Sequence, residues 1–186
     1  MGDSDFFPAM TAGTAEHWRR IAERDAAFNR KLPDWILLQL TMLRDDCHGF
    51  AIDRLEHCLQ TATRAFRDGR DEEYVVCALV HDIGAMLAPD HHAEFIGMIM
   101  APYISPENRW MLHHHGLFQS YYFAHFFGGN RNARDRLKEH PLYAYTEEFC
   151  RVYDQAAFDR DYPSMSLAEF EPMLRRVLSK RKTPQM

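Results

Sequence analysis

The sequence lacks several features that would point to a membrane or to nucleic acid. No apolar run approaches the ~18 residues that a helix needs to cross a bilayer, so no membrane span is expected. Basic residues are not in excess, because 22 lysines and arginines stand against 27 aspartates and glutamates, with a formal net charge of -5. The one basic cluster, at residues 175–182, is typical of a solvated helix end. Neither a membrane nor nucleic acid is therefore expected as a partner.

Cysteine is scarce as well. The four cysteines are Cys47, Cys58, Cys77 and Cys150, and no two of them form a CxxC pair. Three of the four lie in helix-like apolar patterns, as free buried thiols do in a reducing compartment. Residues 1–13 are acidic and contain no basic segment followed by an apolar one, which is the pattern of a secretory signal. A cytoplasmic protein is therefore expected.

Internal repeats, low-complexity linkers and the alternating pattern of strands are also missing, and helix signals follow one another instead. Thr14, Asp53, Asp71, Ser105 and Ser166 stand where helix N-caps are expected. Helices are predicted at about residues 15–31, 35–46, 54–68, 72–82, 91–100, 107–115, 132–140, 142–158 and 167–180, with Gly116 stopping the one before it. The sequence predicts an all-α fold and a single domain over residues 1–186, long enough to bury a large core.

Histidine is abundant: there are 11, and one of them lies in the stretch CALVHDIGAML at residues 77–87. An apolar, helix-like run ends there in His81 and Asp82, two strong metal ligands side by side. Adjacent residues on a helix point about 100° apart, so both side chains can reach one pocket if the helix ends at this point. A carboxylate can bridge two metal ions ~3.5–4 Å apart, whereas an imidazole binds only one.

Other candidate ligands lie on predicted helices along the chain. They are His57, His92, His115 and Asp154. A lone histidine on an apolar face is usually a hydrogen-bonded core residue, and the remaining histidines at 91, 113, 114 and 125 are interpreted in that bland way. The joint order of a histidine, a His-Asp pair and a late aspartate favours a metal site. Nitrogen and oxygen ligands suit iron, manganese or zinc.

That order, carried by His57, His81, Asp82 and Asp154, resembles the HD-domain superfamily of helical metalloproteins. The stretches LEHCLQTA (residues 55–62), HAEFIG (92–97) and HHGLFQ (114–119) resemble its di-iron oxygenase branch, which includes inositol oxygenase and the phosphonate-cleaving oxygenases. RVYDQAAF (151–158) is similar to the phosphonate enzymes. The likeness covers about residues 50–178, and residues 1–49 are expected to form N-terminal helices that serve as a wall or lid.

The resemblance implies an HD-domain helical bundle with a buried dinuclear metal site. One iron would be held by His57, His81, Asp82 and Asp154, and the other by His92 and His115, with Asp82 bridging the two. The metals would be a mixed-valent Fe(II)/Fe(III) pair, with O2 as co-substrate. Arg151 would bind the phosphonate, because its planar fork suits phosphate-like oxygens. Gln119 matches a second substrate-binding position.

The implied reaction is O2-dependent cleavage of the C–P bond of a 1-hydroxyalkylphosphonate, a small-molecule substrate. Enzymes of this kind that act on 2-amino-1-hydroxyethylphosphonate have a tyrosine and a glutamate where this chain has Cys47 and Phe50. Aromatic side chains near the expected site are Trp35, Phe50, Phe118, Tyr121 and Tyr122, and aromatic faces attract a quaternary ammonium. The best-fitting substrate is therefore (R)-1-hydroxy-2-(trimethylammonio)ethylphosphonate, which would give glycine betaine and phosphate. The primary amine, giving glycine and phosphate, is the alternative.

Three rival interpretations remain at the level of sequence. A metal-dependent phosphohydrolase would need fewer ligands than this chain offers, and a non-catalytic sensor would not need the full set. A polyol oxygenase would not need the guanidinium of Arg151. Asp45, Asp46 and His48 either contribute to a cation pocket or are simply solvated. The oligomeric state is not indicated.

Overall fold

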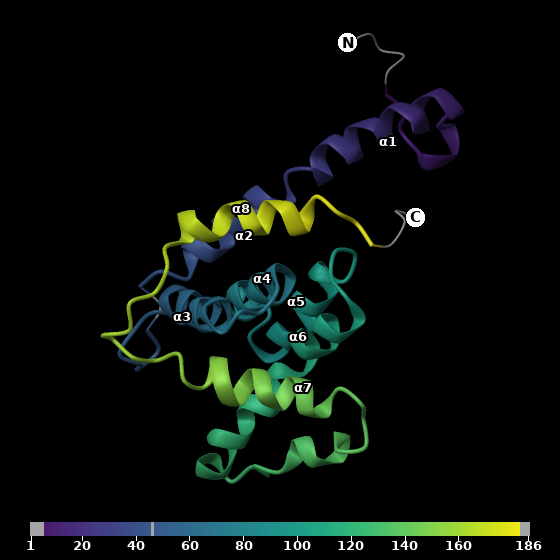
Figure 1. The fold of residues 1–186 in the computed structure, drawn as a ribbon. Coiled ribbons are helices and arrows are strands. Elements are labelled where there is room, and N and C mark those ends of the chain that lie inside the picture. The colour runs from purple at the N-terminus through teal and green to yellow at the C-terminus, as the bar shows by residue number, and fades with distance from the viewer. Residues whose placement is uncertain (1–5, 46, 183–186) are drawn as a thin grey trace.

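The computed structural model describes residues 6–45 and 47–182, and within these ranges the chain forms eight α-helices and no strand (Figure 1). The α-helices are α1 (Ala15–Asn29), α2 (Leu32–Met42), α3 (Arg54–Arg67), α4 (Glu72–Val80), α5 (His92–Met100), α6 (Pro106–Gln119), α7 (Tyr143–Glu148) and α8 (Leu167–Leu178). A π-helix (Phe149–Asp154) continues α7, and short 3-10 helices fill the connections. The predicted all-α fold is confirmed. Across the described residues, no helix combines the length and apolarity that crossing a membrane requires.

Helix α4 forms the centre of the core. Every residue from Tyr74 to Val80 is buried, because the helix packs against α3, α6 and α8 and so has no solvent face. A helix that is apolar all round is stable only in such an enclosed position. The buried helix carries the His-Asp pair at its C-terminal end, and the surrounding helices supply the other polar side chains of the interior.

Helices α5 and α6 pack closely against each other, and α6 also contacts α4. Gly97 of α5 lies against the backbone of His113 on α6, and a Cβ atom at Gly97 would meet the His113 Cα at 3.3 Å. A glycine therefore sets the close approach of the two helices. This approach brings His92 of α5 and His115 of α6 to 3.4 and 3.5 Å from Asp82, which follows α4.

The five predicted N-caps are confirmed. Thr14, Asp53, Asp71, Ser105 and Ser166 each accept a hydrogen bond from the backbone N–H three residues on. These bonds satisfy backbone donors that would otherwise have no partner at the helix starts.

Several of the predicted helices differ from the structure. The helix expected at residues 35–46 runs from Leu32 to Met42, because Pro33 is accommodated in the first turn, where its missing N–H is not needed. Helix α6 runs through Gly116 to Gln119 instead of stopping, and Gly116 lies beside the His92 ring, where a Cβ would be in ordinary van der Waals contact at 3.4 Å. The helix expected to reach residue 158 becomes a π-helix that ends at Asp154. The segment predicted as a helix at residues 132–140 forms only a short 3-10 helix, Ala133–Leu137.

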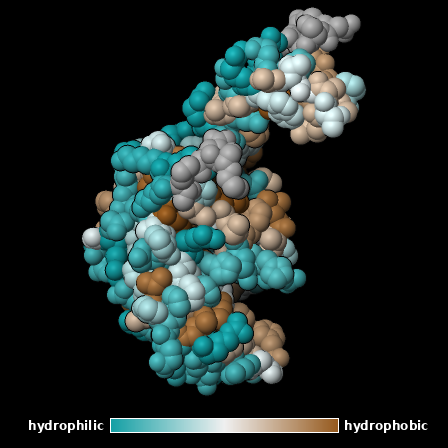
Figure 2. Space-filling view, turned by 90° about the vertical axis from the view of Figure 1, so that its right-hand side faces the viewer, coloured by the Kyte–Doolittle hydropathy of each residue, from teal (hydrophilic) through white to brown (hydrophobic). Residues whose placement is uncertain are grey.

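Helix α1 stands away from the rest of the protein. It has no buried residue, and in Figures 1 and 2 it projects beyond the layer formed by α2 and α8. Its contacts are local: a capping box joins Thr14 and His17, and Arg20 pairs with Glu16 at 2.9 Å. By contrast, α8 is tied to the main body, where Arg175 pairs with Asp34 of α2 at 2.7 Å.

Candidate metal centre

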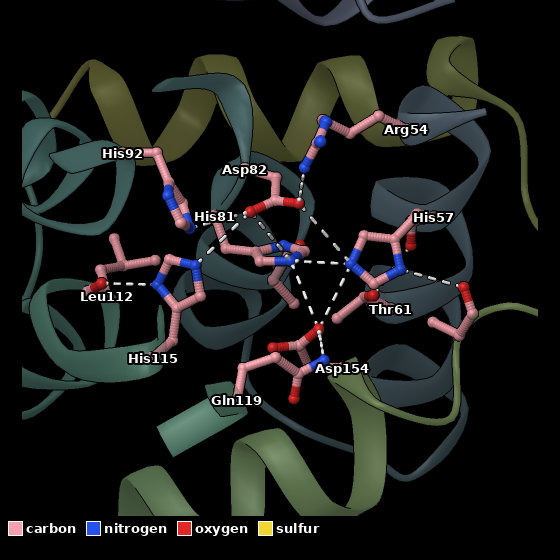
Figure 3. A network of polar contacts seen from close by, with 12 residues as sticks. Arg54, His57, Thr61, His81, Asp82, His92, Leu112, His115, Gln119 and Asp154 are labelled. Carbon is pink, nitrogen blue, oxygen red and sulfur yellow. Dashed lines mark hydrogen bonds and ion pairs between the residues drawn. The ribbon is translucent and has the colours of Figure 1, made fainter. Parts of the chain in front are cut away.

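All six side chains predicted as metal ligands lie together at the end of α4 (Figure 3). His57 lies on α3, His81 and Asp82 follow the last residue of α4, His92 begins α5, His115 lies on α6, and Asp154 ends the π-helix. Five of the six are buried, and the His92 side chain is 27 % exposed. The cluster therefore joins five separate helices of the fold.

Backbone carbonyls orient every imidazole of the cluster. The Nδ1 atoms of His57, His81, His92 and His115 lie 3.0, 2.8, 3.3 and 2.7 Å from the carbonyl oxygens of Ala157, Ala78, Pro89 and Leu112. A carbonyl can only accept, so each Nδ1 carries the proton and donates it. This assignment leaves the four Nε2 atoms with free lone pairs that face the centre of the cluster. Hydrogen bonds of this kind are the usual outer support of metal-binding histidines.

Several lone pairs of the cluster face one another with no hydrogen-bond donor between them. His57 Nε2 and His81 Nε2 lie 3.0 Å apart, and with both Nδ1 atoms protonated no proton is left to join them. His115 Nε2 and Asp154 Oδ2 are buried and have no hydrogen-bond partner. A buried acceptor without a donor is costly, and several of them around one point call for a positive charge. The site therefore fits a metal cation by the chemistry of its own atoms.

Asp82 is placed between two groups of histidines. Its Oδ1 lies 3.4 Å from His92 Nε2 and 3.5 Å from His115 Nε2. Its Oδ2 lies 3.9 Å from His57 Nε2 and accepts a hydrogen bond from Arg54 Nη1 at 2.9 Å. Oδ1 also lies 3.8 Å from His81 Nε2, so this oxygen faces His81, His92 and His115, while Oδ2 faces His57. A carboxylate whose two oxygens face different ligands has the arrangement expected of a bridge.

Asp154 completes the group around His57 and His81. Its Oδ1 lies 3.3 Å from His57 Nε2 and 3.7 Å from His81 Nε2. Gln119 Nε2 donates to the same oxygen at 3.0 Å. Atoms that share a metal at ~2.1 Å are separated from each other by about 3.0–3.4 Å, close to these spacings. Two groups could hold an ion, namely His57, His81 and Asp154, and His81, Asp82 and His115.

Electrostatics within the cluster shift the pKa values of the ligands in both directions. Burial favours the neutral acid, but the neighbouring His81, His115 and His57 together hold the pKa of Asp82 well below its usual range. Burial lowers the pKa of His81 to about 4, so this imidazole is neutral at physiological pH. Burial also acts on His57, but its hydrogen bond with Asp154 and the two nearby carboxylates outweigh it and raise the pKa. Carboxylates and neutral imidazoles are the forms that bind metals, so Asp82 and His81 are held in those forms, whereas a metal would displace the proton that the carboxylates favour on His57.

A cavity of about 780 Å³ opens onto the cluster. Its polar wall includes five of the six predicted ligands, with Arg54 and Gln119 beside them. Its remaining wall is largely aromatic. Pockets of roughly 300–1,000 Å³ are the size that encloses small-molecule ligands, so the cluster is accessible to a substrate.

Of the four residues predicted to bind substrate, three line the cavity and one does not. Phe50, Gln119 and Tyr122 line the cavity. Arg151 does not: its side chain is 56 % exposed, and its Nε donates to Glu147 at 3.2 Å on the protein surface. The cavity has another guanidinium that the sequence analysis did not select, Arg54. Its position one helical turn before His57, on the same face of the helix, was the signal available in the sequence.

Most of the aromatic residues named from the sequence lie elsewhere. Trp35, Phe118 and Tyr121 do not line the cavity, and Phe118 is fully buried in the core. Phe123, Phe126, Phe127 and Phe158 take their place in the wall. Of the polar residues left open near residue 47, His48 lines the cavity and Asp45 does not, while Asp46 lies outside the described residues.

The helical bundle and the buried histidine–aspartate cluster define an all-α protein of the metal-binding class. The family model of the HD domain matches residues 54–151, just over half of the chain, and the protein belongs to the HD domain family. Members of this family are typically metal-dependent enzymes, both hydrolases and oxygenases. Among curated proteins, none is similar enough to this chain to count as a relative.

Proposed function

We propose that the protein is an O2-dependent di-iron oxygenase that cleaves the C–P bond of a 1-hydroxyalkylphosphonate. The observation that carries this proposal is the position of Asp82, whose Oδ2 faces His57 while its Oδ1 faces His81, His92 and His115. A mononuclear site has no use for the second group, formed by His92 and His115. The overall reaction takes one hydroxyphosphonate and one O2 to one carboxylic acid and one phosphate.

Two irons, when bound, would supply the activation of O2 and the removal of hydrogen from the carbon next to phosphorus. His57, His81, Asp82 and Asp154 are the residues that would hold one iron, and His92, His115 and Asp82 the other. The protein's own groups would bind and orient the substrate. Gln119 fits this role because its Oε1 is buried without a hydrogen-bond partner and can accept from the substrate hydroxyl.

Arg54 takes the role of phosphonate-binding residue in this proposal, in place of Arg151. It lines the cavity, and its Nη1 already donates to Asp82. A guanidinium has five donors in a rigid fork, so Arg54 can hold a phosphonate oxygen while keeping its contact with the carboxylate. A neutral polyol would not require such a group, which argues against a sugar-polyol oxygenase.

The substrate we propose to test first is (R)-1-hydroxy-2-(trimethylammonio)ethylphosphonate, with glycine betaine and phosphate as products. Asp53 also lines the cavity, but its Oδ1 accepts from Glu56 N–H and its Oδ2 from Asp45 N–H, at 2.7 and 3.1 Å. A carboxylate engaged in this way is a poor partner for a primary ammonium. Aromatic rings of the wall, such as Phe50, suit a quaternary ammonium that donates no hydrogen bond.

A metal-dependent phosphohydrolase is the second candidate. The match to the HD domain supports it, because hydrolases are among the enzymes of that family. Arg54 beside Asp82 also suits a phosphate ester, for which a metal would supply the nucleophilic hydroxide. The two candidates differ in their need for O2.

The test of the function is a count of metals on protein purified anaerobically, followed by low-temperature EPR after partial oxidation. Two irons per chain and a mixed-valent S = 1/2 signal that changes when the hydroxyphosphonate is added are expected. One zinc or manganese per chain, no such signal, and phosphate release without O2 would assign the protein to the hydrolases.

The role of Arg54 has a matched control in Arg151. Loss of a charge-assisted hydrogen bond of about 1.5–3 kcal/mol predicts that Arg54→Ala raises the substrate KM roughly 10- to 150-fold. Arg151→Ala removes an equally charged side chain that pairs only at the surface, so its KM should stay near that of the wild type. Equal effects of the two substitutions would contradict the assignment of Arg54.

A further inference from the structure

Three phenylalanines at the outer part of the cavity are unusually exposed. Phe123, Phe126 and Phe127, which we call the aromatic extension, are 48, 77 and 84 % exposed and all line the cavity. Single exposed apolar residues are ordinary, but three that gather at the mouth of a cavity form a patch that indicates a binding surface.

The aromatic extension is held by ordered backbone rather than by a loose loop. Phe126 N–H donates to the Phe123 carbonyl at 3.0 Å, and Gly129 N–H donates to the Ala124 carbonyl at 2.9 Å. Gly128 follows the short 3-10 helix Ala124–Phe127 and ends it with a left-handed backbone (φ 76°), a conformation that favours glycine. The rings are therefore presented at the cavity by a defined turn.

The inner part of the cavity already has its own aromatic rings. Phe158 stacks on the ring of His57 with centroids 4.4 Å apart, and Phe50 stacks on Phe158 at 4.6 Å. This stack leads outward from the metal cluster and offers the faces that a small ammonium group needs. The aromatic extension is not needed to bind a small ammonium group.

The size of the cavity also indicates a ligand larger than the ammonium compound. A volume of about 780 Å³ falls in the upper part of the range for drug-sized ligands. A phosphonate with a two-carbon ammonium side chain is much smaller than such ligands. Filling the inner cavity with it would leave the three phenylalanines in water.

We propose that the aromatic extension binds an apolar chain of the substrate, so that the preferred substrates are amphiphilic 1-hydroxyalkylphosphonates with a tail longer than the ammonium compound has. This inference rests on the proposed function, because it places the phosphonate head at the metal cluster and Arg54. The tail would run along the stack of Phe158 and Phe50 to reach Phe126 and Phe127. Specificity at the outer cavity then comes from burial of apolar surface.

The test measures binding rather than turnover. Iron-reconstituted protein, kept anaerobic, is titrated by calorimetry with 1-hydroxyethyl-, 1-hydroxybutyl- and 1-hydroxyhexylphosphonate. Burial of each methylene should tighten Kd about fourfold. Phe126→Ser and Phe127→Ser should flatten this dependence on chain length while leaving the Kd of the shortest compound unchanged. Phe28→Ser is the matched control, because Phe28 is 60 % exposed on α1 and does not line the cavity.

Several outcomes would overturn the inference. One is equal Kd values across the series, and another is a chain-length dependence that survives Phe126→Ser and Phe127→Ser. Failure to bind any phosphonate also refutes it. So does a flat series accompanied by self-association that Phe126→Ser abolishes, because the aromatic extension would then contact a second copy of the chain.

A second measurement, phosphate release under O2 with the same compounds, separates this inference from the function on which it rests. If Kd depends clearly on chain length but no O2-dependent phosphate release occurs, the inferred binding site for the apolar tail is kept and the oxygenase function is rejected. O2-dependent phosphate release at the same kcat/KM for every chain length would retain the oxygenase and reject the tail.

Discussion

Replacing Gly84 with alanine should weaken the proposed metal position formed by Asp82, His92 and His115. Gly84 is buried, and a Cβ atom there would lie 2.8 Å from the carbonyl oxygen of His92 and 2.9 Å from its Cα. Favourable contacts between such atoms begin at about 3.5 Å, so the backbones must separate by about half an ångström or more. Both contacts are to backbone, which cannot rotate out of the way.

Either direction of movement disturbs the proposed position formed by Asp82, His92 and His115. Movement of the start of α5 displaces His92, and movement of the segment around Gly84 displaces Asp82, two residues earlier, which the proposal assigns to both metals. Metal–ligand distances tolerate only about ±0.2 Å, which is less than the required shift. We expect affinity for the metal held by Asp82, His92 and His115 to fall about 10- to 100-fold, as it does when outer supports of a site are lost. Overpacking should also lower the free energy of unfolding by about 1–3 kcal/mol.

The assay is the metal-to-protein ratio after anaerobic reconstitution and dialysis, with a thermal melt of the same sample. A fall below two metals per chain is expected for Gly84→Ala. The control is Gly69→Ala, where φ is +77° and nothing lies within 4 Å of the new Cβ. That variant should lose about 1–2 kcal/mol through backbone strain alone and keep both metals. Two metals bound by Gly84→Ala with wild-type affinity would refute the steric reasoning.

Three further predictions concern stability. Burial opposes ionisation of Glu73, but its bonds with Lys182 and with Ser105 lower its pKa, so its contribution to stability is present above its ordinary pKa and lost as pH falls through the lowered one. The stability gap between wild type and Glu73→Gln in urea should therefore shrink from about pH 7 to about pH 3. Removing the metals with a chelator should lower Tm by roughly 5–10 °C relative to metal at a hundredfold excess over Kd, and adding metal back should restore it. Ser166→Ala breaks the capping box with Glu169 and should cost about 1 kcal/mol, read from thermal unfolding.

Local signals in the sequence were sufficient for the five helix starts that have a side-chain cap. A cap such as Ser166 and the N–H from which it accepts a hydrogen bond are only three residues apart, so neither depends on the rest of the fold. The end of α6 was different, because Gly116 continues the helix and lies beside the ring of His92, which comes from another helix. A glycine in the sequence does not reveal whether it ends a helix or lies inside one.

The six predicted metal ligands and the substrate-facing residues differ in the same way. The ligands have a signal in the sequence itself, whereas the substrate-facing residues depend on the surrounding fold. The ordered pattern of His57, His81 and Asp82 along the chain carries its own signal. On an α-helix Arg151 would share a face with Asp154, since residues three apart differ by only about 60° around the axis. In the π-helix that forms there each residue advances less, and the same two residues differ by more than about 100°. The sequence contains no local indication of that widened turn.

The π-helix also has a consequence for the direction in which the last carboxylate of the cluster points. Its wider hydrogen bonding, such as Gln155 N–H to the Cys150 carbonyl at 3.0 Å, accommodates one residue more than an α-helical turn would. If the same residues wound as an α-helix instead, each step would advance about 100° rather than about 80°, and from Phe149 to Asp154 the direction of the carboxylate would change by roughly 90°. The last carboxylate of the cluster is therefore oriented by the winding of the backbone at this point as well as by the identity of its residue.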